Sequence, residues 1–557
     1  MEIYILGSND RAAIACIHSL RNYDVVLNII YGNHSCPSLQ SKYLNSKHYI
    51  SQTQKLNKTL DQIRAIVPKR ALLIPVNDYY LEFTLRFFEE LSKDFYMSYG
   101  DKRSTEQIIN KRDLQHVAAS VDIDVPKTHL VSSLEDIDKL ASLNLCFPVI
   151  VKPVKSCMIV NDLILSTSVK KVLTLEKLTL ELTLNINNID YMIQEYIPGS
   201  GCALNFFAVN GDIRAVFQYD RIHEPGFGGG SSYRGSVSLD GVLVNKSKAL
   251  LRKYNFTGMG MIEFRSASLD GRQYLMEINA RPWGSLALPV FAGIDFPSLV
   301  LKHHLGEEFG PIDYRAGVYA RNITKDVNWL VRNGFKRKGP LAIFEPIIAL
   351  GNFFKSTETF DGLAAHDFKP FLKGIVNVGL NTSSRIWRKI VSQILMLRQG
   401  AECIAISQRV ASLIKTKKVC FVCRGNIIRS KYAQLYYEKM TGREAVSCGT
   451  FFSENRNSPP VAVEVALRRG LNLNSMSSTT IFSMLDLDDY VFFVMDEQNL
   501  YDLRFQFKAE NVYLLSVAAG KKGPISDPYS HAFNADKYHD AFAQIEDYVH
   551  KIFGAAS

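Results

Sequence analysis

The chain has 557 residues, of which 47% are hydrophobic and 22% are charged, and its net charge is +10. This length corresponds to about three or four domains, and the composition excludes disordered, collagen-like and low-complexity proteins. It contains no uncharged apolar stretch of about 18 residues, so we expect no transmembrane helix. The start, MEIYILGSNDR, lacks the basic region of a secretory signal, and the nine cysteines are odd in number and scattered along the chain. We therefore expect a cytoplasmic protein with free thiols.

Strand-like runs alternate with helical patterns from residue 1 to about residue 320. IYIL (3–6), VVLNIIY (25–31) and ALLIPV (71–76) are apolar runs of strand length, and helical stretches separate them. This alternation is typical of βαβ units, so the fold class is predicted to be α/β.

Two adjacent strand-like segments, GMGMIEFR (258–265) and YLMEINARPWGS (274–285), carry Glu263, Glu277 and Asn279. Three oxygen ligands on neighbouring strands suit a Mg²⁺ ion that bridges nucleotide phosphates. Arg281 lies two residues after Asn279 and so faces the same side of the strand, where a guanidinium can stabilise a transferring phosphoryl group. Upstream, Lys152 ends the strand FPVIVKP (147–153), and Glu195 ends the strand of YMIQEYIPGSG (191–201), positions suited to phosphate and adenine recognition.

In their order and spacing, these segments resemble the ATP-grasp superfamily of carboxylate–amine ligases. The resemblance covers about residues 1–306. It implies a pre-ATP-grasp βα domain (1–100) followed by an ATP-grasp domain (101–320) made of two α+β halves. It also implies that ATP is bound by Lys111, Lys152, Glu195, Ile197 and Arg221, that Glu263, Glu277 and Asn279 hold Mg²⁺, and that Arg281 acts in catalysis. The chain departs from the family after Pro153, where VKSCMIVND (154–162) replaces a Gly-rich lid.

A basic segment follows. Between residues 331 and 418 there are 15 Lys or Arg and 5 Asp or Glu, and this difference equals the net charge of the whole chain. We predict a largely helical connector over 331–417. Within SRIWRKIVSQILMLRQ (384–399), apolar side chains recur at helical spacing. This face must be buried on another domain, on a second copy of the chain, or in an anionic membrane surface, which would place the protein peripherally at the inner face of a membrane.

A second βα block begins at KVCFVC (418–423) and contains Cys423 and Arg429, with five residues between them, on a strand-to-helix turn. Loop amides and a helix N-terminus bind anions and favour a thiolate, and an arginine can bind two phosphate oxygens. Ser430 can donate a hydrogen bond to the sulfur. Near the end of the chain, Asp527 in SDPY (526–529) is a candidate general acid.

This block resembles the low-molecular-weight protein tyrosine phosphatases over about residues 418–554. The resemblance implies a doubly wound parallel-sheet domain (418–557) in which Cys423 attacks phosphorus, Arg429 binds the phosphoryl oxygens and Asp527 protonates the leaving group, with no cofactor. The phosphate-binding loop would comprise Arg424, Gly425, Asn426, Ile427, Ile428 and Ser430. The chain departs from the family at Ile428, Lys431 and Gln434.

The sequence thus predicts a bifunctional enzyme. An ATP- and Mg²⁺-dependent ligase would form an amide-type bond through an acyl-phosphate, and a phosphatase would hydrolyse a phosphomonoester, with phosphotyrosine favoured. The expected partners are a small-molecule carboxylate, an amine, and a phosphoprotein or phosphorylated small molecule. A homodimer is compatible with the apolar face of 384–399, and no nucleic acid is expected. Two alternatives stay open: a nucleotide-sensing ATP-grasp domain that regulates the phosphatase, and a phosphatase that acts on a small-molecule phosphate in the pathway of the ligase.

Overall fold

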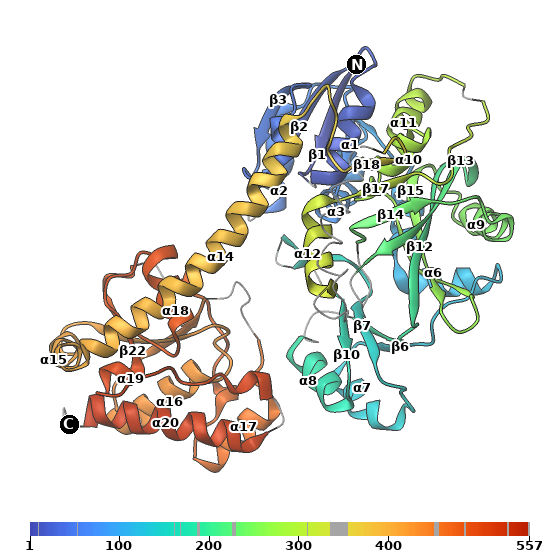
Figure 1. Ribbon diagram of the computed structural model, residues 1–557. Coiled ribbons are helices and arrows are strands. Elements are labelled where there is room, and N and C mark those ends of the chain that lie inside the picture. Colours follow the sequence, from blue (N-terminus) through green and yellow to red (C-terminus); the bar gives the residue numbers. More distant parts are fainter. Residues whose placement is uncertain are drawn as a thin grey trace. The chain divides into compact units, whose positions relative to one another are not determined.

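A computed structural model describes residues 1–8, 10–52, 54–160, 162–166, 169–185, 190–224, 230–308, 310–334, 355–450, 456–483, 486–531 and 534–554 (Figure 1). The chain divides into two compact units. Unit 1 comprises Met1–Leu130, Pro148–Lys171 and Met192–Gly379, and unit 2 comprises Val131–Phe147, Val172–Tyr191 and Leu380–Ser557. The apolar run at 341–354 lies outside the described residues. The four domain borders given above remain predictions.

The N-terminal sheet of unit 1 is parallel and has the strand order β3-β2-β1-β4-β5. Its strands are β1 (Glu2–Leu6), β2 (Val26–Tyr31), β3 (Leu44–Tyr49), β4 (Leu72–Pro75) and β5 (Tyr96–Met97), and its helices are α1 (Asp10–Leu20), α2 (Leu56–Ile66), α3 (Asp78–Arg86) and α4 (Phe88–Leu91). Ile3 and Ile5 share one hydrophobic core with Ile17 of α1, whereas Tyr4 and Leu6 lie in a second core. Because successive side chains alternate, the continuous apolar strand is buried on both faces, and the predicted βα domain is confirmed.

The next part of the chain forms a four-stranded sheet of order β10-β7-β11-β6 and a hairpin of β8 and β9. The strands are β6 (Thr128–Val131), β7 (Val149–Pro153), β8 (Cys157–Val160), β9 (Leu163–Ser166), β10 (Lys170–Val172) and β11 (Tyr191–Glu195). The helices of this part are α5 (Lys102–Ile109), α6 (Lys111–Ala119), α7 (Leu134–Asp138) and α8 (Leu175–Asn185). Strand β8 of this hairpin lies within 154–162, the segment that stands in place of the Gly-rich lid of the ATP-grasp family.

A seven-stranded sheet, of order β16-β15-β12-β13-β14-β17-β18, carries four of the nine predicted ligase residues, namely Arg221, Glu263, Glu277 and Asn279. Its strands are β12 (Gly199–Val209), β13 (Asp212–His223), β14 (Tyr233–Ser236), β15 (Gly258–Ala267), β16 (Gln273–Asn279), β17 (Tyr319–Arg321) and β18 (Glu358–Phe360). The accompanying helices are α9 (Gly241–Tyr254), α10 (Ala287–Ala292), α11 (Phe296–His304) and α12 (Ile323–Gly334). The edge strand β18 pairs in parallel with β17 inside the segment predicted as connector. With three residues, it is too short for its alternation to be recognised in the sequence.

The C-terminal part of unit 2 contains a parallel sheet of order β20-β19-β21-β22, as predicted for a doubly wound domain. Its strands are β19 (Lys418–Cys423), β20 (Val446–Gly449), β21 (Tyr490–Val494) and β22 (Val512–Leu514), and its helices are α16 (Arg429–Thr441), α17 (Pro460–Arg468), α18 (Glu497–Tyr501), α19 (Leu515–Ala518) and α20 (Ala535–Phe553). Tyr432 of α16 stacks on Phe542 of α20, with ring centroids 3.7 Å apart. These two helices therefore pack together.

The helix predicted within 384–399 is part of α14 (Lys369–Ala401), which α15 (Cys403–Leu413) follows. Leu395 packs against the core of the C-terminal sheet, and Gln399 bonds the backbone of β22 through Val512 O (2.9 Å) and Leu514 N (3.0 Å). Trp387 and Ile394 of the predicted apolar face remain 63% and 55% exposed. The side chains of Arg385 and Ile386 lie outside the described residues. A search of the described helices found none that is long and apolar enough to cross a membrane.

Candidate active sites

The turn between β19 and α16 is held in place by Asn426, which is fully buried and has a left-handed φ of 48°. Its backbone N–H donates to Cys423 Sγ at 3.3 Å. Its side-chain amide donates to Ser430 Oγ (2.9 Å) and Ser447 Oγ (2.8 Å), and its oxygen accepts from Thr479 N (2.8 Å). Asparagine tolerates this backbone conformation better than most residues, so its side chain and backbone together fix the loop around the sulfur.

Cys423 lies at the end of β19 and is buried, with its Sγ 3.0 Å from Ser430 Oγ. Gly449 packs under the loop, because a Cβ there would lie 2.9 Å from Arg424 O. The phosphate-loop residues predicted from the sequence, 424–428 and Ser430, are therefore brought together around Cys423. Ser447, Gly449 and Thr479 were not predicted as site residues.

Arg429 begins α16 and points its buried guanidinium toward two acidic loops. Nη1 donates to Asp496 Oδ2 (3.0 Å) and Ile525 O (2.9 Å), and Nη2 pairs with Asp527 Oδ2 at 2.8 Å. Burial opposes the charge of Arg429, but Cys423, Asp527 and Asp496 outweigh burial and raise its pKa above the usual value. The predicted nucleophile, phosphate ligand and general acid thus meet at one site, with the side chain of Asp527 44% exposed.

One departure from the phosphatase family, Lys431, places a second buried cationic side chain on α16, in addition to Arg429. Lys431 is buried on α16, where its Nζ donates to Met476 O at 2.7 Å. Burial lowers the pKa of this lysine to about 8. Gln434, the other departure on this helix, donates to Ala445 O at 2.8 Å. Both residues make local structural contacts.

In unit 1, the register of β15 and β16 places Glu263 directly opposite Glu277. The amide nitrogen of Asn279 donates to Glu263 Oε1 (3.1 Å) and Glu277 Oε1 (3.4 Å), so the three predicted metal ligands form one cluster. Burial raises the pKa of Glu263. Burial has the same tendency at Glu277, but Lys111 and Lys152 reverse it and lower the pKa of this carboxyl. Two neighbouring, partly buried carboxylates repel each other, and a bound cation relieves this repulsion.

Basic side chains surround this cluster. Lys111 Nζ lies 3.3 Å from Glu277 Oε2 and donates to Ser156 Oγ at 2.9 Å. Lys152 donates to Met276 O at 3.1 Å, and burial together with the charge of Lys111 lowers its pKa to about 7. Arg281 makes a two-point ion pair with Asp78, at 2.7 and 2.8 Å. Asp78, from the N-terminal domain, was not predicted from the sequence.

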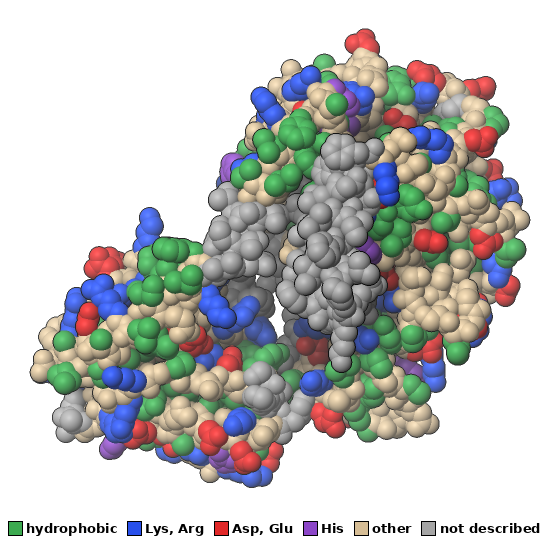
Figure 2. Space-filling model, viewed as in Figure 1, with side chains coloured by type: hydrophobic (Ala, Val, Ile, Leu, Met, Phe, Trp, Pro, Cys, Tyr) green, Lys and Arg blue, Asp and Glu red, His purple; other side chains and the backbone are tan. Residues whose placement is uncertain are grey.

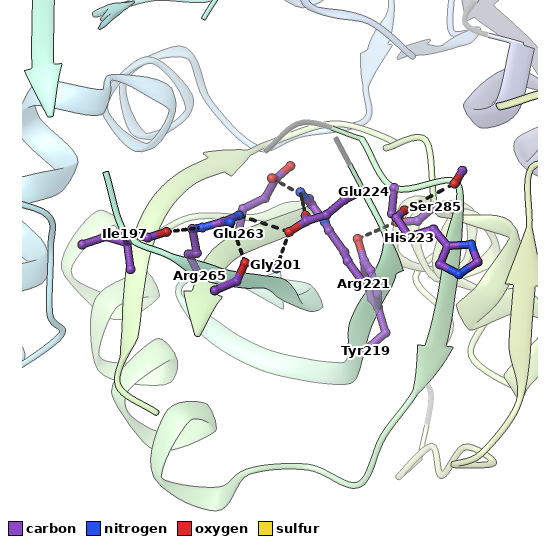
Figure 3. A network of polar contacts seen from close by, with 12 residues as sticks. Ile197, Gly201, Tyr219, Arg221, His223, Glu224, Glu263, Arg265 and Ser285 are labelled. Atoms are coloured by element: carbon purple, nitrogen blue, oxygen red, sulfur yellow. Dashed lines mark hydrogen bonds and ion pairs between the residues drawn. The ribbon is translucent and has the colours of Figure 1, made fainter. Parts of the chain in front are cut away.

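Arg221 belongs to a buried network on β12, β13 and β15 (Figure 3). Its Nη2 pairs with Glu263 Oε2 at 2.5 Å. Glu224 Oε1 accepts from Gly201 N (3.0 Å) and Arg265 Nη1 (3.1 Å), and Arg265 Nε donates to Ile197 O (2.6 Å). Figure 3 shows Arg221 and Arg265 converging on Glu224 from β13 and β15, the strands on either side of β12, a link that the sequence analysis missed.

A cavity of about 210 Å³ unites part of the predicted ligase site. Of the predicted residues, its lining includes Arg221, Glu263, Glu277, Asn279 and Arg281. Lys111 and Ser156 line a smaller cavity of about 30 Å³ that shares Glu277 and Asn279 with the first. Lys152, Glu195 and Ile197 line neither cavity, and Glu195 lies at the end of β11, where its N–H donates to Lys127 O at 3.0 Å.

Family comparisons match both halves of the chain. Residues 101–251 match the RimK-like ATP-grasp domain, and residues 187–326 match the family described as ATP-grasp in the biosynthetic pathway with Ter operon. Residues 418–556 match low molecular weight phosphotyrosine protein phosphatase.

Individual relatives cover parts of the chain. A protein-arginine-phosphatase of Bacillus subtilis is 27% identical over 142 residues, which is 24% of this chain and 93% of the relative. The low molecular weight protein-tyrosine-phosphatase PtpB of Staphylococcus haemolyticus is 28% identical over 130 residues, 23% of this chain and 91% of the relative. The solved structure of N5-carboxyaminoimidazole synthetase from Staphylococcus aureus, complexed with ADP, has 16% identity, covers 60% of this chain and 85% of its own, and gives a TM-score of 0.46. The family matches show that the chain combines an ATP-grasp domain, within residues 101–326, with a low molecular weight phosphotyrosine protein phosphatase domain at residues 418–556.

Proposed function

We propose that the ligase domain uses ATP and Mg²⁺ to join a carboxylate to an amine through an acyl-phosphate. The observation that carries this proposal is the cluster of Glu263, Glu277 and Asn279, enclosed by cationic side chains at one cavity. Among the described residues there is no group of three or more His, Cys, Asp or Glu side chains that could hold a metal ion. The carboxylates of Glu263 and Glu277 are the oxygen ligands that this cluster offers to Mg²⁺, and hard oxygen donors suit this ion. Asn279 joins them when its amide turns, because its nitrogen faces the two carboxylates and its oxygen accepts from Arg281 Nη2 at 3.3 Å.

In this proposal the bound cation supplies charge neutralisation for the nucleotide phosphates. Lys111 and Lys152 bind phosphate oxygens, and Glu195 and Ile197 border the adenine. Arg221 and Arg281 bind the phosphoryl group as it moves to the substrate carboxylate, so that the amine then attacks an activated carbonyl and releases phosphate. Arg281 has to exchange part of its ion pair with Asp78 for the phosphoryl oxygens.

For the phosphatase domain we propose attack of Cys423 on phosphorus to give a cysteinyl-phosphate. Arg429 and the loop amides bind the phosphoryl oxygens, and Ser430 stabilises the thiolate. The substrate phosphate displaces Asp527 from Arg429, which frees this half-exposed carboxyl to protonate the leaving group and then to activate water. No cofactor enters this sequence of steps.

Substrates with different leaving groups distinguish the possible substrate classes of the phosphatase. Phosphotyrosine is our first candidate, and phosphoarginine is the second because one relative is a protein-arginine-phosphatase. Hydrolysis rates of phosphotyrosine peptides, phosphoarginine peptides and small sugar or amino-acid phosphates by the full chain distinguish these classes. A preference for the small phosphates would instead place the phosphatase in the metabolic pathway of the ligase.

The buried Lys152 predicts how ATP affinity depends on pH. Its pKa is about 7 in the free protein, and nearby phosphates raise the pKa in the complex because they favour the charged amine. Binding of ATP then takes up a proton above about pH 7, so affinity falls as pH rises, by up to about tenfold per pH unit. Calorimetry in buffers of different ionisation enthalpy measures this proton uptake. Lys152→Met is expected to weaken binding and remove the uptake, whereas uptake retained in this variant would contradict the assignment.

We propose that the exposed face of α14 contacts an anionic membrane surface, which would hold a cytoplasmic protein at the inner face of a membrane. Trp387, Ile390 and Ile394 are exposed on this helix together with basic Lys389. Figure 2 shows hydrophobic and basic side chains next to one another on the visible face of unit 2. Sedimentation with phosphatidylserine vesicles is expected to capture the full chain, and replacement of the three apolar residues by serine is expected to release it. Unchanged capture of this variant by the vesicles would contradict membrane contact. If the unmodified chain instead forms a concentration-dependent dimer that the three substitutions abolish, the face belongs to an interface with a second copy of the chain.

A further inference from the structure

The cavity of about 210 Å³ is also lined by residues that have no part in the proposed function. Arg11 of α1, Gly230, Ser231 and Gly284 lie on its wall. Arg11 Nη1 donates to Ser231 O at 3.2 Å. A Cβ at Gly284 would lie 2.6 Å from Arg11 Nη2, and one at Gly230 would lie 3.1 Å from it. The two glycines therefore leave the space that this guanidinium occupies.

The charged residues that line the cavity are balanced, with three arginines (Arg11, Arg221, Arg281) and three acids (Asp78, Glu263, Glu277). Behind Arg11, around Asp361, positive charge exceeds negative charge. Arg234 is fully buried and pairs with Asp361, whereas Arg11 Nη1 is 3.9 Å from the same carboxylate. Burial, and then the charges of Arg234 and Arg221, lower the pKa of Arg11 although Asp361 opposes this shift. The charge of Arg11, followed by burial, lowers the pKa of Lys325 to about 8. Arg11, Arg234 and Lys325 thus share the single charge of Asp361, and an anion would relieve their repulsion.

An unused hydrogen-bond donor lies on the same wall. Trp283 lines the cavity with its side chain 1% exposed, and its Nε1–H has no hydrogen-bond partner among the described residues. An unsatisfied buried N–H is costly, and a bound acceptor removes that cost. A guanidinium fork and an indole N–H that line one cavity suit a planar carboxylate, which presents two acceptor oxygens.

We propose that Arg11 binds a carboxylate that a substrate of the ligase carries in addition to the carboxylate that becomes activated. This inference rests on the proposed ligase function and extends it to the substrate class. A ligand that presents this additional carboxylate is an amino acid or a dicarboxylic acid. A simple amine or a monocarboxylic acid has no additional carboxylate for Arg11 to bind. Arg11 belongs to the N-terminal βα domain, so this domain would take part in substrate recognition.

Matched acid and amide probes test the proposal on the full chain. Calorimetry measures the binding of L-glutamate and L-glutamine, L-aspartate and L-asparagine, and L-alanine and L-alaninamide in the presence of saturating Mg-ADP. We expect at least one acid to bind about thirtyfold more tightly than its amide, the size of one charge-assisted contact. Arg11→Gln should abolish this preference, and Arg11→Lys should retain part of it because the charge remains while the fork is lost. The change of preference distinguishes recognition from a purely structural role of Arg11.

Arg21→Gln is the matched control, since it removes an arginine that follows the same helix and does not line the cavity. It should leave the acid preference unchanged. Equal binding of acids and amides, binding of none of the acids to a protein that binds ADP, or a preference that survives Arg11→Gln would overturn the inference alone. Failure to bind ADP would overturn the proposed ligase function and the inference together. Inorganic phosphate that binds in an Arg11-dependent manner, when none of the acids does, would overturn the assignment to a carboxylate.

Discussion

Cys423→Ser is expected to lower the hydrolysis of p-nitrophenyl phosphate by about 10⁴-fold or more, because a serine hydroxyl at this position has no base to activate it. The loop geometry should survive, since Ser430 and Asn426 N–H can bond an oxygen as they bond the sulfur. Steady-state phosphatase kinetics measure the loss. ADP formation by the ligase domain should be unchanged in the same preparation.

Cys403→Ser provides the control for this substitution. Cys403 is a half-buried thiol on α15 and donates to Val517 O at 3.4 Å, away from the phosphate loop. This variant should retain phosphatase activity within about twofold, as expected of a substitution outside a reacting group. Substantial residual activity in Cys423→Ser would show that another group is the nucleophile.

Glu277→Gln is expected to lower ADP formation by about 10³-fold, because it removes one negative charge from the proposed Mg²⁺ ligands. It also removes the ion pair with Lys111 and leaves that buried amine without its carboxylate partner. The required Mg²⁺ concentration should rise as well, so ADP formation is measured over a magnesium titration. Phosphatase activity should not change.

Glu307→Gln is the matched control, because Glu307 is exposed after α11 and lies on neither cavity. Its ADP formation should equal that of the unmodified chain. If Glu277→Gln retained full ADP formation with an unchanged magnesium requirement, the cluster at β15 and β16 would not be the metal site.

The parts of both sites that are close in sequence could be predicted from it. Cys423 and Arg429 lie on one turn, so their spacing alone places the guanidinium beside the thiol. Glu263 and Glu277 lie on consecutive antiparallel strands. The connection between β15 and β16 sets the register that places these two residues opposite each other. The continuous apolar run of β1 likewise indicates a strand buried on both faces.

Contacts between distant segments could not be predicted. Asp78 reaches Arg281 across 203 positions, and Asp361 reaches Arg234 across 127. Such pairs leave no periodic pattern in the local sequence. Asp361 follows a three-residue strand within the segment that was predicted to be a largely helical connector. In α14 the spacing correctly predicts a helix. That Leu395 is partly buried and Ile394 is exposed depends on which surface packs against the helix, and the spacing does not reveal this.

The central claim is that one chain carries two independent active sites. It is tested most directly by measuring ADP formation in purified Cys423→Ser protein with Mg-ATP, across pools of carboxylic acids and amines. This variant removes the phosphatase, which would otherwise consume phosphorylated intermediates. We predict ADP formation that requires both one acid and one amine. ATP binding without ADP formation in any pool would contradict the ligase assignment and favour a nucleotide-sensing domain that regulates the phosphatase.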